Sequence, residues 1–167
     1  CAAVLPFAVS SPFLSNLPLE KYGLTWVHPA IPFAHPLDNG RCGVVHRSLE
    51  ETANRLYQDA TTYKRLIGPL TDRWSDLAAE VMRPAMRLPR HPITLGRYGL
   101  NGVRSATALV KRFQTVEANA IFAGCSAHGV LPLDASLTGG FATLFCASAH
   151  AQGWPVVAGG SQKLADA

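Results

Sequence analysis

The chain has 167 residues, of which 48% are hydrophobic and 16% are charged, and its formal net charge is +4. The modest charge excludes the dense basic stripe that nucleic-acid binding normally needs, and no apolar run reaches the roughly 18 residues of a membrane span. Typical domains have about 25% charged residues. The shortfall predicts apolar surface that meets another domain, a ligand or a membrane, although a large core would produce the same bias.

The first part of the chain, residues 1–47, is expected to be an apolar start followed by a β-hairpin. Alternation of apolar and polar residues over 24–28, together with its strand-forming residue types, predicts a strand. An Asp-Asn-Gly turn at 38–40 follows, and its last two residues suit positive φ angles. Residues 41–46 are expected to return as the second strand of the hairpin.

Helical periodicity replaces the strand pattern from residue 48 to residue 167. Ser48 begins the first helix with a capping box, and Asp59 is placed to cap the second. The pair Gly68-Pro69 is expected to end that second helix, because proline cannot continue a helical hydrogen-bond pattern, and it is placed to start the next one. The expected fold class is therefore α+β and mostly helical, with a β-hairpin followed by six to seven helices.

Two later helices have patterns that indicate how they pack. Thr115 is expected to cap a helix that runs to about residue 127 and carries apolar side chains on its inner side: Ala118, Ile121, Phe122 and Cys125. Residues 135–150 form a helix of small residues, which permits close approach of neighbouring helices. A Gly-Gly pair at 159–160 then precedes a helix that opens at Ser161 and is cut off by the end of the sequence.

Six histidines and four cysteines are present, but their spacing is not typical of a metal site, and we expect none. The cysteines are expected to be free thiols, which predicts a reducing, cytoplasmic location. Four arginines and one histidine between residues 83 and 97 form the one local concentration of positive charge. This cluster is either a solvated turn face or a contact for lipid headgroups or an acidic partner, in which case the protein would be membrane-peripheral.

Several short phrases follow one another in a fixed order along the chain. They are Ser-Pro-Phe-Leu at 11–14, Leu-Pro-Leu-Glu-Lys-Tyr-Gly-Leu-Thr-Trp at 17–26, Ala-His-Pro-Leu-Asp-Asn-Gly at 34–40, Arg-Ser-Leu-Glu-Glu-Thr at 47–52, Leu-Pro-Leu at 131–133, Gly-Trp-Pro at 153–155 and Gly-Gly-Ser at 159–161. In this order and spacing they resemble the central region of FAD-dependent oxidoreductases of the phytoene-desaturase-like family, within the amine-oxidase-type flavoproteins.

The resemblance implies that residues 1–167 are the substrate-binding (cap) region of a larger flavoprotein. Its lobes would be the apolar start with the hairpin (1–47) and the helical part (48–167). The dinucleotide fingerprint of the family is not in this sequence, which begins at Cys1, and we interpret the chain as an excised piece. Its partner would be the missing FAD-binding domain of the same protein, so the fragment alone is expected to be non-catalytic and without bound FAD.

The resemblance also implies roles for particular residues. Gly159, Gly160 and Ser161 would form a turn that returns the chain toward the flavin. Trp154 would border the active site, and three phenylalanines would line a pocket for an apolar small-molecule substrate, unless they are plain core residues: Phe122, Phe141 and Phe145.

Two further expectations concern the surface of the fragment. Surface that the missing domain would cover is predicted to make the fragment self-associate. The alternative to an enzyme part is a non-catalytic helical module that binds a lipid, a membrane surface or a protein partner.

Overall fold

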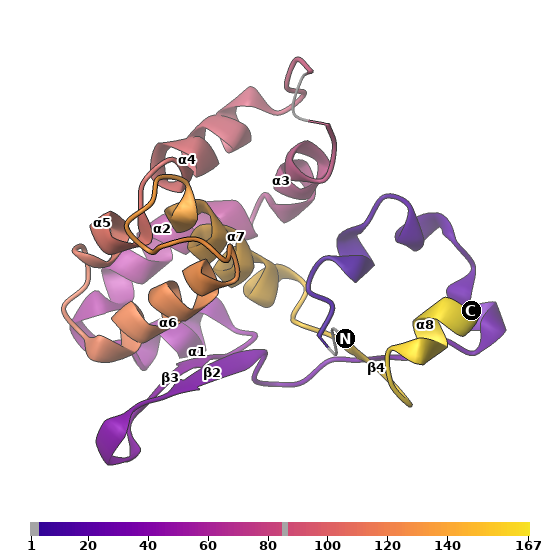
Figure 1. The fold of residues 1–167 in the computed structure, drawn as a ribbon, viewed down its shortest axis with the longest axis horizontal. Helices are drawn as coiled ribbons and strands as arrows, with labels where there is room; N and C mark the ends of the chain where they lie inside the picture. Colours follow the sequence, from indigo (N-terminus) through magenta and orange to yellow (C-terminus); the bar gives the residue numbers. More distant parts are fainter. Residues whose placement is uncertain (1–3, 85–86) are drawn as a thin grey trace.

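The computed structural model describes residues 4–84 and 87–167, and these residues form eight α-helices and two small antiparallel sheets. The expected α+β, mostly helical class is thereby confirmed. The helices are α1 (Leu49–Asn54), α2 (Ala60–Thr71), α3 (Trp74–Val81), α4 (Pro92–Gly102), α5 (Ala106–Val110), α6 (Val116–Ala127), α7 (Thr138–Ala151) and α8 (Gln162–Asp166), and the strands are β1 (Trp26–Val27), β2 (Phe33–Pro36), β3 (Cys42–Val45) and β4 (Val156–Val157). Figure 1 shows α1–α7 gathered into one body, with α8 and the C-terminus apart from it.

Helix α7 is the centre of the helical part, because α2, α4, α5 and α6 all pack against it. It is buried on nearly all sides, which its small residues allow. A Cβ atom on Gly139 would lie 2.9 Å from the carbonyl oxygen of Arg104, and one on Gly140 would lie 2.9 Å from Tyr98 Oη. The predicted close approach to a small-residue helix is confirmed. The helix begins three residues later than expected, because Leu137 has a left-handed φ of 75°.

The hairpin consists of β2 and β3, with Phe33 opposite Val45 and Pro36 opposite Cys42. Its turn is as predicted, since Asn39 and Gly40 have φ angles of 61° and 71°. The prediction that residues 24–28 form the first strand of this hairpin was wrong. Antiparallel pairing extends outward from the turn, so the residues next to the turn form the first strand.

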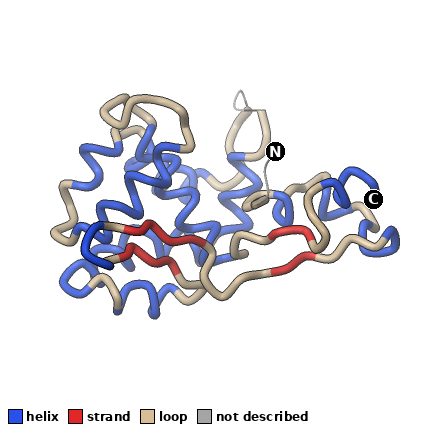
Figure 2. Tube along the Cα trace, turned by 60° about the horizontal axis from the view of Figure 1, so that its bottom comes forward, coloured by secondary structure: helices blue, strands red, loops and turns tan. Residues whose placement is uncertain are grey.

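Strand β1 lies within the segment expected to start the hairpin, but it pairs with β4 near the end of the chain. The partners are Trp26 with Val157 and Val27 with Val156. Leu5 N–H also donates to Pro155 O at 3.0 Å. Figure 2 shows the two sheets as separate pairs of strands. Val4, Leu5 and β1 therefore lie against residues 155–158, while the hairpin packs on α6.

The N-terminal segment before β1 contains three short 3₁₀-helices, η1 (Ala8–Ser10), η2 (Leu14–Asn16) and η3 (Leu19–Tyr22). None of these turns contains a buried residue. Phe7 is an exception to the loose packing of this segment, since its ring lies 5.1 Å from that of Phe145. The segment thus contributes little to the core and keeps apolar side chains at the surface.

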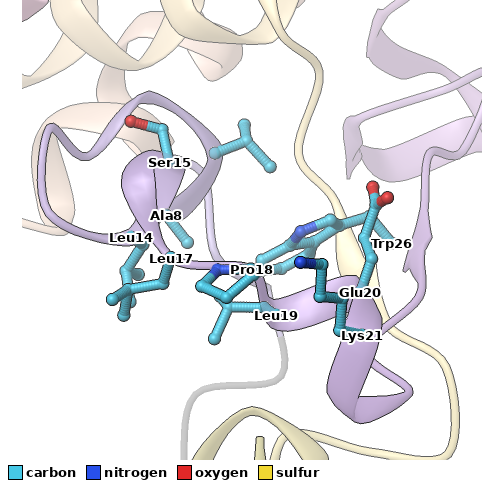
Figure 3. A pocket seen from close by; sticks show the side chains of 10 residues that line it. Ala8, Leu14, Ser15, Leu17, Pro18, Leu19, Glu20, Lys21 and Trp26 are labelled. Carbon is cyan, nitrogen blue, oxygen red and sulfur yellow. The ribbon is translucent and has the colours of Figure 1, made fainter.

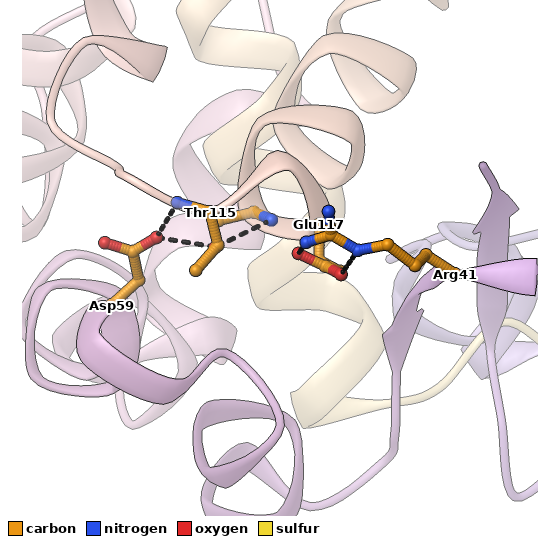
Figure 4. A network of polar contacts seen from close by, with 5 residues as sticks. Arg41, Asp59, Thr115 and Glu117 are labelled. Carbon is orange, nitrogen blue, oxygen red and sulfur yellow. Dashed lines mark hydrogen bonds and ion pairs between the residues drawn. The ribbon is translucent and has the colours of Figure 1, made fainter. Parts of the chain in front are cut away.

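The three predicted N-caps have different outcomes, and the cap of Thr115 at the start of α6 is confirmed. The Ser48 hydroxyl accepts the N–H of Glu51 at 3.2 Å, so the cap of α1 is confirmed. Asp59 does not cap α2. Its carboxylate instead accepts the N–H groups of Gln114 and Thr115 and, at 2.6 Å, the hydroxyl of Thr115 (Figure 4). Asp59 has helical backbone angles, because it ends the turn η5 (Tyr57–Asp59). Its side chain accepts hydrogen bonds from a segment 55 residues away in the sequence.

Helix α2 continues through Gly68 and Pro69 to Thr71, so its expected end was wrong. The residue before a proline avoids helical angles because its Cβ and N–H clash with the proline ring. Glycine has no Cβ, which removes part of this conflict at position 68. The continued helix places Leu70 in the core, where it is 2% exposed.

Removing the Asp59 carboxylate should lower the stability of the folded protein. In Asp59→Ala the buried N–H of Thr115 and its hydroxyl lose their acceptor, and we expect the free energy of unfolding to fall by about 3 kcal/mol. Urea denaturation followed by circular dichroism measures this. Asp72→Ala, at an exposed aspartate that ends α2, is the control and should stay within about 0.5 kcal/mol of wild type. Equal losses in both variants would contradict the assignment.

Two glycine-to-alanine changes should have opposite effects on stability. Gly139→Ala places a Cβ against backbone atoms of the α4–α5 connection, which cannot move without repacking, and should cost roughly 2 kcal/mol. Gly96→Ala in α4 meets nothing within 4 Å, so the better helix former should stabilise by roughly 0.5 kcal/mol. Thermal melting of the two variants tests the close approach, and a stabilised Gly139→Ala would refute it.

Candidate functional site

The Gly-Gly turn after β4 is exposed and has backbone angles that favour glycine. Gly159 and Gly160 have φ angles of 79° and 97°, and Gly160 N–H donates to Val157 O at 3.0 Å. A Cβ on Gly160 would meet no atom within 4 Å. Ser161 precedes α8 and makes no side-chain cap bond. The turn thus presents bare backbone to any group that approaches it.

Trp154 lies just before β4 and joins several segments. Its ring is 4.4 Å from that of Phe33 on β2 and 5.3 Å from that of Phe145 on α7. His128, at the end of α6, lies 6.0 Å away. The indole N–H donates to Ser148 Oγ at 3.2 Å. Trp154 is only 7% exposed, so it anchors the chain that leads to the Gly-Gly turn rather than offering a free face.

The three phenylalanines expected at a substrate pocket lie in different surroundings. Phe145 belongs to the aromatic cluster with Trp154. Phe122 is fully buried and stacks on Phe113 at 4.6 Å, so it is a core residue with no surface for a ligand. Phe141 covers Gly129, where a Cβ would lie 2.7 Å from the phenyl ring. The structure therefore brings together Trp154 and Phe145, but not the other two.

A groove of about 470 Å³ lies along the N-terminal segment, where sequence reasoning placed no site (Figure 3). It is mostly apolar, and the charged pair Glu20 and Lys21 lies beside Trp26 in it. The available signal was the run of apolar residues between prolines, which has neither helical nor strand periodicity. The lining residues are Ala8, Val9, Leu14, Ser15, Leu17, Pro18, Leu19, Glu20, Lys21 and Trp26.

The groove is connected to the Gly-Gly turn through the β1–β4 ladder. Trp26 lines the groove and is the pairing partner of Val157. On the adjoining residue, Ala158 N–H donates to Thr25 O at 2.9 Å. Gly159 follows directly. An apolar ligand held in the groove would therefore contact β1, whose partner strand β4 leads into the exposed turn.

Apolar side chains around this region face solvent. Phe13 is 71% exposed and Tyr22 is 68% exposed, and Val27 and Ile31 are each nearly half exposed. All four side chains lie within residues 13–31 of the chain. We call this stretch, residues 13–31, the apolar flank.

The buried titratable groups lie away from the groove. Tyr63 and His150 form a hydrogen bond of 2.7 Å in the core, and the His150 Nδ1 lies 3.3 Å from Arg47 O. A carbonyl only accepts, so Nδ1 carries the proton and the Tyr63 hydroxyl donates to Nε2. Burial lowers the pKa of His150 to about 4. Burial also raises the pKa of the Cys125 thiol, which is therefore not an activated nucleophile.

Within residues 4–84 and 87–167, no group of three or more histidine, cysteine, aspartate or glutamate side chains could hold a metal ion. None of the helices described is both long enough and apolar enough to cross a membrane.

No protein-family model, no curated protein and no solved structure matches the chain. The relation to flavoproteins stays a prediction from the residues quoted above.

Neutral, buried His150 should make stability depend on pH. The unfolded histidine binds a proton near pH 6.5, whereas the folded one resists protonation down to about pH 4. The stabilisation is thus complete above pH 6.5 and is lost as the pH falls toward 4, by about 3 kcal/mol in all. Urea denaturation at a series of pH values should show this slope in the wild type and in the exposed-histidine control His28→Gln. The slope should be shallower in His150→Gln, and an unchanged slope there would contradict the assignment.

Proposed function

We propose that the chain is the substrate-side part of an FAD-dependent oxidoreductase of the dehydrogenase or desaturase type, which acts on an apolar substrate. One observation carries the proposal. An apolar groove is joined by the β1–β4 ladder to an exposed Gly-Gly turn, in a chain whose phrases resemble the central region of this family. The chain would act only together with the FAD-binding domain of the same protein.

The Gly-Gly turn fits the approach of a large planar group. Gly160 has open space where a side chain would stand, and Gly159 is approached only by the flexible side chain of Lys163, at 3.7 Å. Gly159, Gly160 and Ser161 would therefore border the FAD. When bound, FAD supplies the hydride or electron transfer, and the protein orients and shields the reacting groups.

The residues of this chain bind and position the substrate in this proposal. The leucines of the groove and Trp26 remove a hydrocarbon from water, which is worth about 25 cal/mol for each Å² of apolar surface buried. Trp154 acts as a positioning residue, because its contacts with Phe33 and Phe145 hold the strand that leads to the turn. Phe122 has no part in it, since it is enclosed in the core.

The apolar flank supports the proposed partner. Phe13, Tyr22 and Val27 expose large apolar surfaces on the same segment as the groove. A second domain of the same protein that covered this segment would bury them and close the groove against water. Without that domain the same surface favours self-association.

A non-catalytic helical module remains the second candidate. It is favoured by apolar residues exposed on the helical part, among them Leu88 at 91% and Ile93 at 75%. These residues lie outside the groove and fit a lipid, a membrane surface or a protein partner. Flavin binding by the full-length protein distinguishes the two candidates.

The full-length protein expressed from its complete reading frame should be yellow, with the absorbance of bound flavin. Gly160→Leu should weaken FAD binding at least tenfold, because the side chain fills the space at the turn. Gly40→Leu is the matched control, since Gly40 also has positive φ and open surroundings but lies at the hairpin tip. It should have a similar backbone strain and keep the flavin.

Two outcomes would contradict the proposal. A colourless full-length protein that takes up no added FAD would favour the binding module. Equal FAD affinity in Gly160→Leu and the wild type would remove the turn from the cofactor site.

A further inference from the structure

A second cavity, of about 370 Å³, lies between α3 and the start of α4. Three arginines from three different segments line it. Arg73 comes from the connection between α2 and α3, Arg90 from the loop before α4, and Arg97 from α4 itself. Sequence reasoning grouped Arg90 and Arg97 by their proximity in the chain but could not add Arg73.

The cavity has an excess of positive charge. Its one carboxylate, Asp76, lies 3.6 Å from Arg73 Nη1 and 3.6 Å from His91 Nδ1. These distances are longer than hydrogen bonds, so the donors of Arg73 remain available. Three guanidinium groups against one carboxylate leave two positive charges, with His91 counted as neutral. An anion is the ligand that this lining attracts.

A buried carboxylate outside the cavity lining fixes the loop that carries Arg90. Glu80 accepts the N–H of Arg90 at 2.7 Å and that of His91 at 2.8 Å, and its side chain is only 2% exposed. It also pairs with Arg83. The Glu80 carboxylate is thus paired with these donors, and its hydrogen bonds hold the loop before α4 against α3.

One large apolar side chain lines the cavity, and a second is exposed in the loop that leads to it. Ile93 lines it and is 75% exposed, and Leu88 in the preceding loop is 91% exposed. Neither contributes to the core. Basic and exposed apolar groups side by side suit a ligand that joins an anionic group to an apolar one.

We propose that this cavity binds a phosphate group, with Arg73, Arg90 and Arg97 as its donors. Each guanidinium is a planar fork that matches two phosphate oxygens. A phosphate could come from a lipid headgroup, with Ile93 in contact with the acyl region, or from a soluble phosphorylated compound. The site shares no residue with the groove or the Gly-Gly turn, so it does not depend on the flavin proposal.

Titration with inorganic phosphate tests the site directly. NMR signals of the arginine Nε–H groups should shift and saturate for the three cavity arginines, and sodium chloride at equal ionic strength should not reproduce the shifts. Arg97→Gln should weaken phosphate binding by about tenfold or more, since a charge-assisted hydrogen bond is lost. Arg104→Gln, which removes an exposed charge beyond the other end of α4, is the control and should bind as the wild type does.

Vesicles distinguish the source of the phosphate. Sedimentation with phosphatidylcholine vesicles that contain phosphatidic acid, but not with phosphatidylcholine alone, identifies a lipid headgroup. That binding should be lost in Arg97→Gln and in Ile93→Ser, whereas Ile93→Ser should keep its affinity for inorganic phosphate. Phosphate binding without vesicle binding identifies a soluble ligand. Binding of neither probe, or equal binding by Arg97→Gln and Arg104→Gln, overturns the proposal.

Discussion

The packing of four helices around the small residues of α7 is the constraint on which the rest of the structure depends. Glycines at 139 and 140 bring α7 against the backbone of α4 and its exit loop. The far end of α7 carries Phe145 and Ser148, which hold Trp154 by ring contact and hydrogen bond. The position of β4 and of the exposed turn after it therefore follows from how α7 is packed.

Polar interactions at the start of α6 attach distant segments to this helical centre. The Asp59 carboxylate binds Thr115, and Arg41 of the hairpin forms a two-bond ion pair with Glu117, at 2.7 and 2.8 Å (Figure 4). The hydrogen bonds from Arg41 hold the pKa of the Glu117 carboxyl below its usual value. Gly43 allows the same approach, since a Cβ there would lie 2.7 Å from Glu117 O. The hairpin is thus fixed on α6 by both charge and shape.

Two regions of the surface differ in their chemistry. The N-terminal segment has an apolar groove and exposed aromatic rings. It is joined to the rest through β1 and β4 and through the contacts of Phe7 and Ser10 with the helical part. The start of α4 offers arginines around a cavity. An apolar substrate and a partner domain suit the first region, and a phosphate suits the second. Since the two regions use different residues, each can be tested without disturbing the other.

The sequence by itself determined the features that depend on near neighbours in the chain: the mostly helical class, the caps at Ser48 and Thr115, the turn at 38–40 and the small-residue helix. Only the tertiary structure decided that β1 pairs with a strand about 130 residues later and that Asp59 accepts hydrogen bonds from Thr115. It also decided that Phe122 is a core residue and that Arg73 lines the same cavity as Arg90 and Arg97. Propensity and periodicity report local backbone preferences. The partner of a strand edge or of a buried carboxylate depends on how distant segments pack together. No local sequence pattern connects those segments.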